Sequence, residues 1–188
     1  MLYHLLYALK NEIHFFNIFK YITFRTFGAL LTAMLIYFVF GKLWIRFLQA
    51  RQFGQVIRDA GPQSHLAKKN TPTMGGLLII VGIVVSSLFW CDLTVPFVWA
   101  TLGVMCAFAF IGFWDDYQKV VKHNPQGLRG QYKIVLEVAV CLMAGLFLYG
   151  LGYLDTALHF PFTKTFTVDL GVWYLFLGFV LIAGAANA

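Results

Sequence analysis

Charged residues are scarce in this chain. Asp, Glu, Lys and Arg make up 12% of its 188 residues, whereas soluble domains carry roughly 25%. Hydrophobic residues make up 60% and aromatic residues 18%, and the mean hydropathy is +0.75. This composition excludes an ordinary soluble domain and predicts a protein embedded in a lipid bilayer.

Cysteine is also rare, and its placement excludes further classes. Cys91, Cys106 and Cys141 are isolated from one another, each in or beside an apolar run. No paired or metal-type spacing is present, so we interpret them as small core residues. The sequence shows no internal repeat and no low-complexity linker.

Long apolar runs predict the fold class. A bilayer core of about 30 Å is crossed by roughly 20 helical residues, and five segments meet that length. We therefore predict an all-α, polytopic transmembrane helical bundle that forms a single membrane domain over residues 1–188. The spans are expected at Tyr21–Phe40, Pro72–Trp90, Pro96–Trp114, Ile134–Leu151 and Leu170–Asn187.

The basic residues indicate an orientation. Ten of the fourteen lie in two connections on one side of the predicted bundle, residues 41–71 and 115–133. The positive-inside rule assigns that side to the cytoplasm, so the amino terminus is expected outside and the carboxyl terminus in the cytosol. Because these cations follow the loops rather than one exposed face, the net charge of +6 does not predict a nucleic-acid partner.

The first twenty residues predict an interfacial helix. Leu2, Leu5, Leu9, Ile13 and Phe16 recur at helical spacing, with polar residues between them. A cleaved signal peptide is not expected, because no basic stretch precedes the apolar residues and no small-residue cleavage site follows them.

Two adjacent carboxylates follow the third predicted span. Asp115 and Asp116 stand at a helix carboxyl end, where the helix dipole already places partial negative charge. Lys119, one turn later, offers a plain ion pair, but it leaves one negative charge unmatched. The alternative is a divalent metal, since Mg²⁺ is often held by one or two carboxylates together with substrate phosphates and water.

A second polar cluster precedes the second span. Thr71 suits the N-cap and Pro72 the first helical position. Free N–H groups and neighbouring lysines, including Lys68, would suit a phosphate, and Gly75 and Gly76 would allow its close approach. An N-cap with snorkelling lysines explains the same residues equally well.

The remaining polar residues lie near helix ends expected at the same membrane face. His123 lies in a short basic loop and is interpreted as solvated, whereas Glu137 is expected to pair with Lys133 one turn earlier. Lys133 stands at the start of the fourth span, and Asn187 at the end of the fifth. The lysines, carboxylates and amide could therefore share one site.

These motifs resemble a known family. Gly61-Pro62-Gln63-Ser64-His65, Thr71-Pro72-Thr73-Met74-Gly75-Gly76 and Asp115-Asp116-Tyr117, together with Lys68, Lys119 to Gly127 and Asn187, closely resemble the MraY family of phospho-N-acetylmuramoyl-pentapeptide transferases. The resemblance runs from about Gly61 to Ala188. It implies transfer of phospho-MurNAc-pentapeptide from UDP-MurNAc-pentapeptide to undecaprenyl phosphate, giving lipid I and UMP, with Mg²⁺ as cofactor.

The resemblance also implies roles for individual residues. Asp115 and Asp116 belong to the catalytic centre, with metal binding as one role, and Lys68, Thr73, Lys119, Lys133 and Asn187 are implied substrate contacts. Complete members are about twice as long, with about ten spans and a later metal-binding aspartate, so we expect this stretch alone to be inactive. A homodimer is left open.

Other functions remain as alternatives. The first is a related prenyl-phosphate N-acetylglucosamine-1-phosphate transferase, although the resemblance implies that the Thr-Pro-Thr-Met-Gly-Gly motif separates this branch from those enzymes. A transporter part is disfavoured because its charges usually lie near the bilayer midplane, and a non-catalytic assembly subunit is the third alternative.

Overall fold

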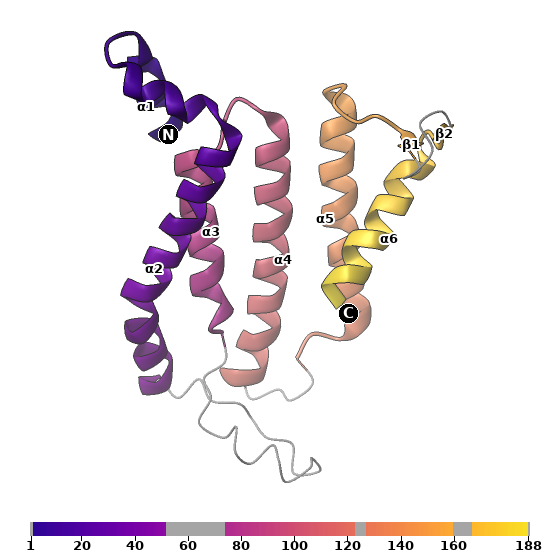
Figure 1. Ribbon diagram of the computed structural model, residues 1–188. Helices are drawn as coiled ribbons and strands as arrows, with labels where there is room; N and C mark the ends of the chain where they lie inside the picture. The colour runs from indigo at the N-terminus through magenta and orange to yellow at the C-terminus, as the bar shows by residue number, and fades with distance from the viewer. Residues whose placement is uncertain (1, 52–73, 123–126, 160–166, 188) are drawn as a thin grey trace. The chain divides into compact units, whose positions relative to one another are not determined.

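The part of the protein that the structure describes consists mainly of helices (Figure 1). The structure, a computed structural model, describes residues 2–51, 74–122, 127–159 and 167–187. Among these residues, three helices are long and apolar enough to cross a membrane, and two shorter helices are also apolar. The predicted helical membrane fold is confirmed at this level. The three long helices are α2 (Ile22–Ala50), α4 (Pro96–Val120) and α5 (Gly130–Gly150), and the shorter ones are α3 (Gly76–Trp90) and α6 (Trp173–Asn187).

The helix bounds differ from the predicted spans where polar residues begin. α2 continues past Phe40 to Ala50, and α4 continues past Trp114 to Val120. Hydropathy marks where a helix leaves the hydrocarbon, but nothing in these polar turns breaks the backbone hydrogen bonding. α3 begins at Gly76 rather than Pro72, because Met74 has a φ of 66°, outside the right-handed helical region.

The first twenty residues form several short helical pieces rather than one helix. α1 (Leu2–Ala8) leads into two 3₁₀ segments, η1 (Leu9–Asn11) and η2 (His14–Lys20), with extended backbone at Ile13 between them. Their helical character agrees with the prediction, whereas the break at Ile13 was not foreseen. Their place at a membrane interface stays a prediction.

His4 ties this amino-terminal segment to the turn between α3 and α4. The Leu93 N–H donates to His4 Nε2 at 3.1 Å, and Asp92 Oδ1 lies 3.5 Å from the same nitrogen. A nitrogen that accepts a hydrogen bond carries no proton, so we assign a neutral imidazole rather than an ion pair. Hydrogen bonds from the Thr94 side chain and backbone hold the pKa of Asp92 below its usual value, with a smaller contribution from the charge of Arg25.

The chain divides into two compact units. The first comprises residues 1–98 and 112–128, and the second comprises residues 99–111 and 129–188. In the first unit α2 packs against α3. The indole of Trp90 donates to Thr32 Oγ1 at 2.9 Å and stacks on Phe19, so one aromatic side chain joins η2, α2 and α3.

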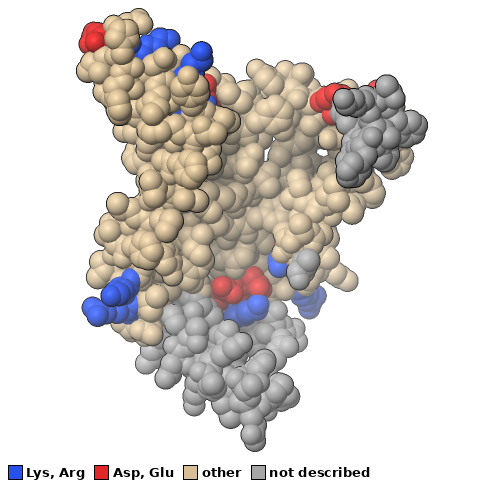
Figure 2. Space-filling view, viewed as in Figure 1, with Lys and Arg blue, Asp and Glu red and all other residues tan. Residues whose placement is uncertain are grey.

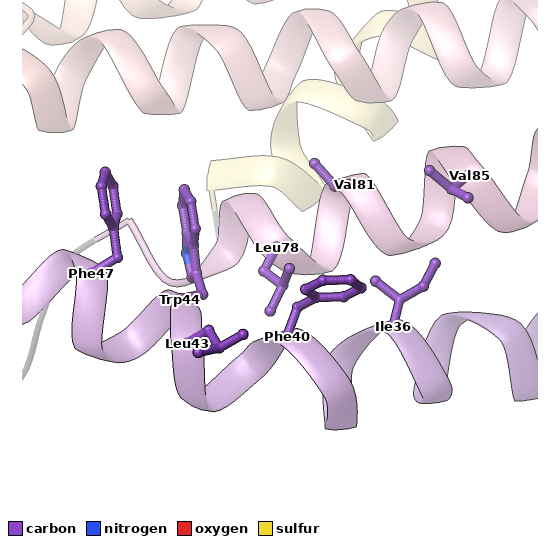
Figure 3. Close-up of a pocket in the computed structure, with 8 residues that line it drawn as sticks. All are labelled: Ile36, Phe40, Leu43, Trp44, Phe47, Leu78, Val81 and Val85. Atoms are coloured by element: carbon purple, nitrogen blue, oxygen red, sulfur yellow. The ribbon is translucent and has the colours of Figure 1, made fainter.

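Further along the same helix pair lies an apolar cavity of about 600 Å³ (Figure 3). Trp44 and Phe47 project from α2, and Leu78, Val81 and Val85 line it from α3. Between Arg25 and Lys42, α2 carries no charged residue, and the corresponding surface in Figure 2 is free of charged atoms. This surface is suited to contact with lipid chains.

The second unit is organised by α5 and α6. A Cβ added at Gly145 would lie 2.6 Å from Leu175 Cδ2, so the glycine permits the close approach of the two helices. An apolar cavity of about 470 Å³ lies beside them. A short antiparallel hairpin, β1 (Ala157–His159) and β2 (Thr167–Asp169), precedes α6 and was not predicted from the sequence.

We predict that Gly28→Ala destabilises the first unit. The added Cβ would lie 2.5 Å from the Trp90 ring, which cannot move away easily because it is stacked on Phe19 and hydrogen-bonded to Thr32. Overpacking of this kind costs about 1–3 kcal/mol. The measurement is the thermal unfolding midpoint in detergent micelles, with Gly103→Ala in α4 as the control, since a Cβ there meets nothing within 4 Å. Equal midpoints for the two variants would contradict the prediction.

Candidate functional site

Five of the residues implied as site residues fall within the described parts of the chain. Asp115, Asp116 and Lys119 lie at the carboxyl end of α4, Lys133 lies in the first turns of α5, and Asn187 is the last residue of α6. Lys68, Thr73 and His123 lie outside the described residues, and their predicted roles stay predictions. Thr71 and Pro72 lie outside them as well, but their predicted places as N-cap and first helical position of α3 are wrong, because α3 begins at Gly76 with Gly75 at its N-cap.

Asp115 is held on both carboxylate oxygens. Lys119 Nζ donates to Oδ2 at 2.6 Å, and the backbone N–H of Leu128 donates to Oδ1 at 2.8 Å. The ion pair that the sequence offered as one alternative is therefore present between Asp115 and Lys119. Charge-assisted hydrogen bonds of this length are the stronger ones in proteins, and together they attach the loop after α4 to the helix end. Asp115 thus orients both a cation and a loop.

Gly127 makes this closure feasible. Its φ of 60° lies in the left-handed region, and a Cβ at this position would lie 2.2 Å from Asp115 Oδ1. Only glycine satisfies both the backbone angle and the space. The contact between Gly127 and Asp115 is a tertiary feature that no local sequence pattern signals.

Asp116 has a different environment. Within the described residues, its carboxylate accepts no hydrogen bond and lies in no ion pair, in contrast to its neighbour. Its side chain is only partly exposed. The two carboxylates are therefore not equivalent: Asp115 is committed to Lys119 and Leu128, whereas the oxygens of Asp116 remain available to a further ligand.

A divalent metal fits part of this arrangement. The described residues contain no group of three or more His, Cys, Asp or Glu side chains that could enclose a metal ion. Mg²⁺, however, commonly takes only one or two carboxylates and completes its octahedron with phosphate and water oxygens. The carboxylate of Asp116 suits the role of such a metal ligand, since it accepts no hydrogen bond from the described residues.

The second unit contains its own polar cluster. Glu137 on α5 is 2% exposed, and Lys133 Nζ lies 4.0 Å from its Oε1. The predicted pair is thus confirmed. The side-chain amide of Asn187 on α6 also donates to Glu137 Oε2, a contact between helices that the sequence did not reveal. The only sequence signal was one acidic residue inside an apolar span.

The start of α3 offers backbone N–H groups without crowding. A Cβ added at Gly75 or Gly76 meets nothing within 4 Å, and both residues are exposed. This space agrees with the close approach expected at these glycines. Whether a phosphate binds there stays a prediction, because Lys68 and Thr73 lie outside the described residues.

The described helices are apolar, and carboxylate–lysine pairs lie in the polar turns of α4 and α5. These features define a class: a multi-pass membrane protein with ionisable residues near the ends of its helices. Comparison with known sequences narrows the class. A family model described as phospho-N-acetylmuramoyl-pentapeptide-transferase signature 1 matches residues 68–80.

Curated relatives match the whole chain. Proteins named phospho-N-acetylmuramoyl-pentapeptide-transferase from Syntrophus aciditrophicus, Pelobacter propionicus and Geobacter sp. strain M21 are each 46% identical over 188 residues, which is 100% of this chain and 52% of each relative. The chain belongs to the phospho-N-acetylmuramoyl-pentapeptide-transferase (MraY) family. It spans about half the length of the curated relatives it matches.

We predict that Gly127→Ala releases the loop from Asp115. The methyl group would overlap Oδ1, and a left-handed backbone costs a residue with a Cβ about 1–2 kcal/mol. The thermal unfolding midpoint should fall, and proteolysis near residue 128 should become faster. Gly130→Ala is the matched control, because that glycine opens α5 and has nothing within 4 Å of an added Cβ. Unchanged proteolysis in Gly127→Ala would contradict the predicted release.

Proposed function

We propose that this chain supplies the amino-terminal half of a transferase. That enzyme moves phospho-MurNAc-pentapeptide from UDP-MurNAc-pentapeptide to undecaprenyl phosphate and yields lipid I and UMP for peptidoglycan synthesis. The observation that carries the proposal is the 46% identity to relatives of that name over all 188 residues. The hydrogen-bonded Asp115–Lys119 pair at a helix end supports it.

The chemistry requires two anions to approach each other. A phosphate monoester has a second pKa of about 6 and is largely ionised at pH 7, so removing its proton is a small part of the barrier. The larger part is the repulsion between the lipid phosphate and the pyrophosphate, together with the charge that develops on the leaving UMP. Positive charge held in a fixed position lowers both contributions.

Asp115 is suited to hold such charge. It keeps the ammonium of Lys119 at 2.6 Å, and the Lys119 side chain is still 40% exposed, so a phosphate oxygen can reach it. With both of its own oxygens engaged, Asp115 is better arranged to organise cations than to receive a proton. We therefore favour an electrostatic role for it over that of a general base.

Asp116 is the residue we propose as a Mg²⁺ ligand, with the rest of the coordination coming from substrate phosphate, water and residues beyond this chain. When bound, Mg²⁺ supplies positive charge to the phosphoryl oxygens. Asp115 is kept as a second, weaker candidate ligand, since its two oxygens already accept hydrogen bonds from Lys119 and Leu128.

The other family motif positions are proposed substrate contacts. They are Lys68 and Thr73, both within the residues matched by the family signature, and Lys133 and Asn187. The proposed orientation places the amino terminus outside and the active face in the cytoplasm, in keeping with the positive-inside rule. A homodimer stays a prediction.

We predict that the 188-residue chain alone shows no turnover, because the complete site needs residues from the other half. Co-expression with the separately encoded carboxyl-terminal half of the Syntrophus aciditrophicus relative should give Mg²⁺-dependent UMP release from UDP-MurNAc-pentapeptide and undecaprenyl phosphate. The control pairs that half with the relative's own amino-terminal half. A working control beside an inactive hybrid would count against the proposed function, and turnover by the chain alone would contradict its predicted inactivity.

We predict that Asp115→Asn in this reconstituted pair lowers turnover about a hundredfold or more at every pH from 7 to 9, the scale of losing a preorganised electrostatic contribution. The substrate phosphate is already ionised over this range, so higher pH offers no compensation. Asp92→Asn, in the turn at the opposite end of α4, serves as the matched control and should retain turnover close to the parent. Recovery of the Asp115→Asn variant as pH rises would indicate a general base instead.

A further inference from the structure

We propose that Glu137 is a positioning residue that fixes the side-chain amide of Asn187, leaving the carbonyl oxygen Oδ1 of Asn187 as the atom offered to a ligand. The ligand group met there would be a hydrogen-bond donor or a metal cation. The orientation of the amide stands on the structure alone. The statement that Asn187 meets substrate rests on the proposed function.

The hydrogen bonds of Asn187 determine its orientation. An asparagine amide has two N–H donors and one carbonyl acceptor. Nδ2 donates to Glu137 Oε2 and, at 2.9 Å, to the backbone carbonyl of Ala183. A carboxylate and a carbonyl only accept hydrogen bonds, so the reversed amide would place oxygen against oxygen at both contacts. The chemistry of the two partners therefore decides which atom is nitrogen.

This orientation limits what Asn187 can recognise. Both N–H groups are used inside the protein, and Oδ1 accepts no hydrogen bond from the described residues. A lone acceptor cannot bind a phosphate oxygen, which is itself an acceptor. It suits an N–H or O–H group of a nucleotide, sugar or peptide, or a hard cation such as Mg²⁺, which prefers oxygen ligands.

The burial of Glu137 explains why the arrangement is stable. At 2% exposed, this carboxylate would be strongly unfavourable without partners. Asn187 supplies a hydrogen bond across from α6, and Lys133 supplies a cation 4.0 Å away on the same helix. The lysine contact is too long for a hydrogen bond, so the amide is the closer of the two partners. Glu137 thus joins two proposed substrate contacts and fixes one of them.

A plain charge partner for Lys133 is the competing role for Glu137, and two substitutions separate the roles. Glu137→Gln removes the charge but keeps a carbonyl that can accept from Asn187. Glu137→Met removes the acceptor and keeps a side chain of similar length that suits an apolar helix. If orientation of the amide is the role, glutamine should preserve it and methionine should abolish it.

The first test observes the amide directly. The chain contains five asparagines, so ¹⁵N-asparagine labelling of the 188-residue chain in detergent micelles gives few side-chain amide signals. The pair of amide proton signals that disappears in Asn187→Asp belongs to Asn187. In the parent and in Glu137→Gln, the Asn187 amide protons should exchange with water at least about tenfold more slowly than those of the exposed Asn11, the scale of a hydrogen bond of about 1.4 kcal/mol. In Glu137→Met this protection should be lost.

Each outcome of that measurement bears on the proposal. Unchanged protection in Glu137→Met, or equal loss in both variants, would overturn it. If Glu137→Met does not fold, the measurement on the parent chain still tests the proposal. Amide protons of Asn187 that exchange with water as fast as those of Asn11 in the parent would overturn the proposal. None of these readings depends on transferase activity.

The second test uses the reconstituted enzyme. Glu137→Met should raise the KM for UDP-MurNAc-pentapeptide or for Mg²⁺ about threefold to tenfold, the effect of one lost hydrogen bond, with a smaller change in kcat. Glu137→Gln should stay near the parent. Loss of kcat with KM unchanged would reject the positioning role, whereas an inactive parent pair beside a protected Asn187 amide would reject the proposed function and retain the orientation.

Discussion

The need to neutralise carboxylates beside hydrocarbon shapes both polar clusters of this protein. An unpaired charge at the membrane boundary is unfavourable. Asp115 and Glu137 each have a lysine one helical turn away, whereas Asp116 forms no ion pair with the described residues. On α4 the lysine follows the acid, as Asp115 and Lys119; on α5 it precedes the acid, as Lys133 and Glu137. In both pairs the lysine lies nearer the polar end of its helix, where its long side chain reaches water.

Much of this could be predicted from the sequence because it is local. Hydropathy predicts the apolar helices, and i to i+4 spacing predicts both ion pairs. The contacts that distinguish the residues are not local. The Leu128 N–H reaches Asp115 only because Gly127 adopts a positive φ, and Asn187 reaches Glu137 from fifty residues away. Such contacts depend on loop closure and helix packing, which no single-segment pattern encodes. The interruption of the helical segments at Ile13 and the β1–β2 hairpin were not predicted for the same reason.

Hydropathy predicts the apolar part of each helix but not the residues at which the helix begins and ends. α2 runs through Lys42 and Arg46 to Ala50, because a helix that leaves the bilayer keeps its backbone hydrogen bonds and simply changes the polarity of its exposed face. In the opposite direction, α3 begins late, since Met74 takes a left-handed conformation directly before Gly75 and Gly76. A non-glycine residue in that region is held there by its surroundings and is more frequent near functional segments.

The unequal surroundings of Asp115 and Asp116 also bear on mechanism. A proton could reach Asp115 only in competition with Lys119 and the Leu128 N–H, both of which stabilise the ionised carboxylate. Those same two groups are donors of the kind that a phosphate oxygen requires. Under the proposed function, an arriving phosphate would therefore compete with Asp115 for these donors rather than deliver a proton to it. We propose that Asp115 acts before the chemical step, because its carboxylate would keep the two donors in place until the substrate anion replaces it.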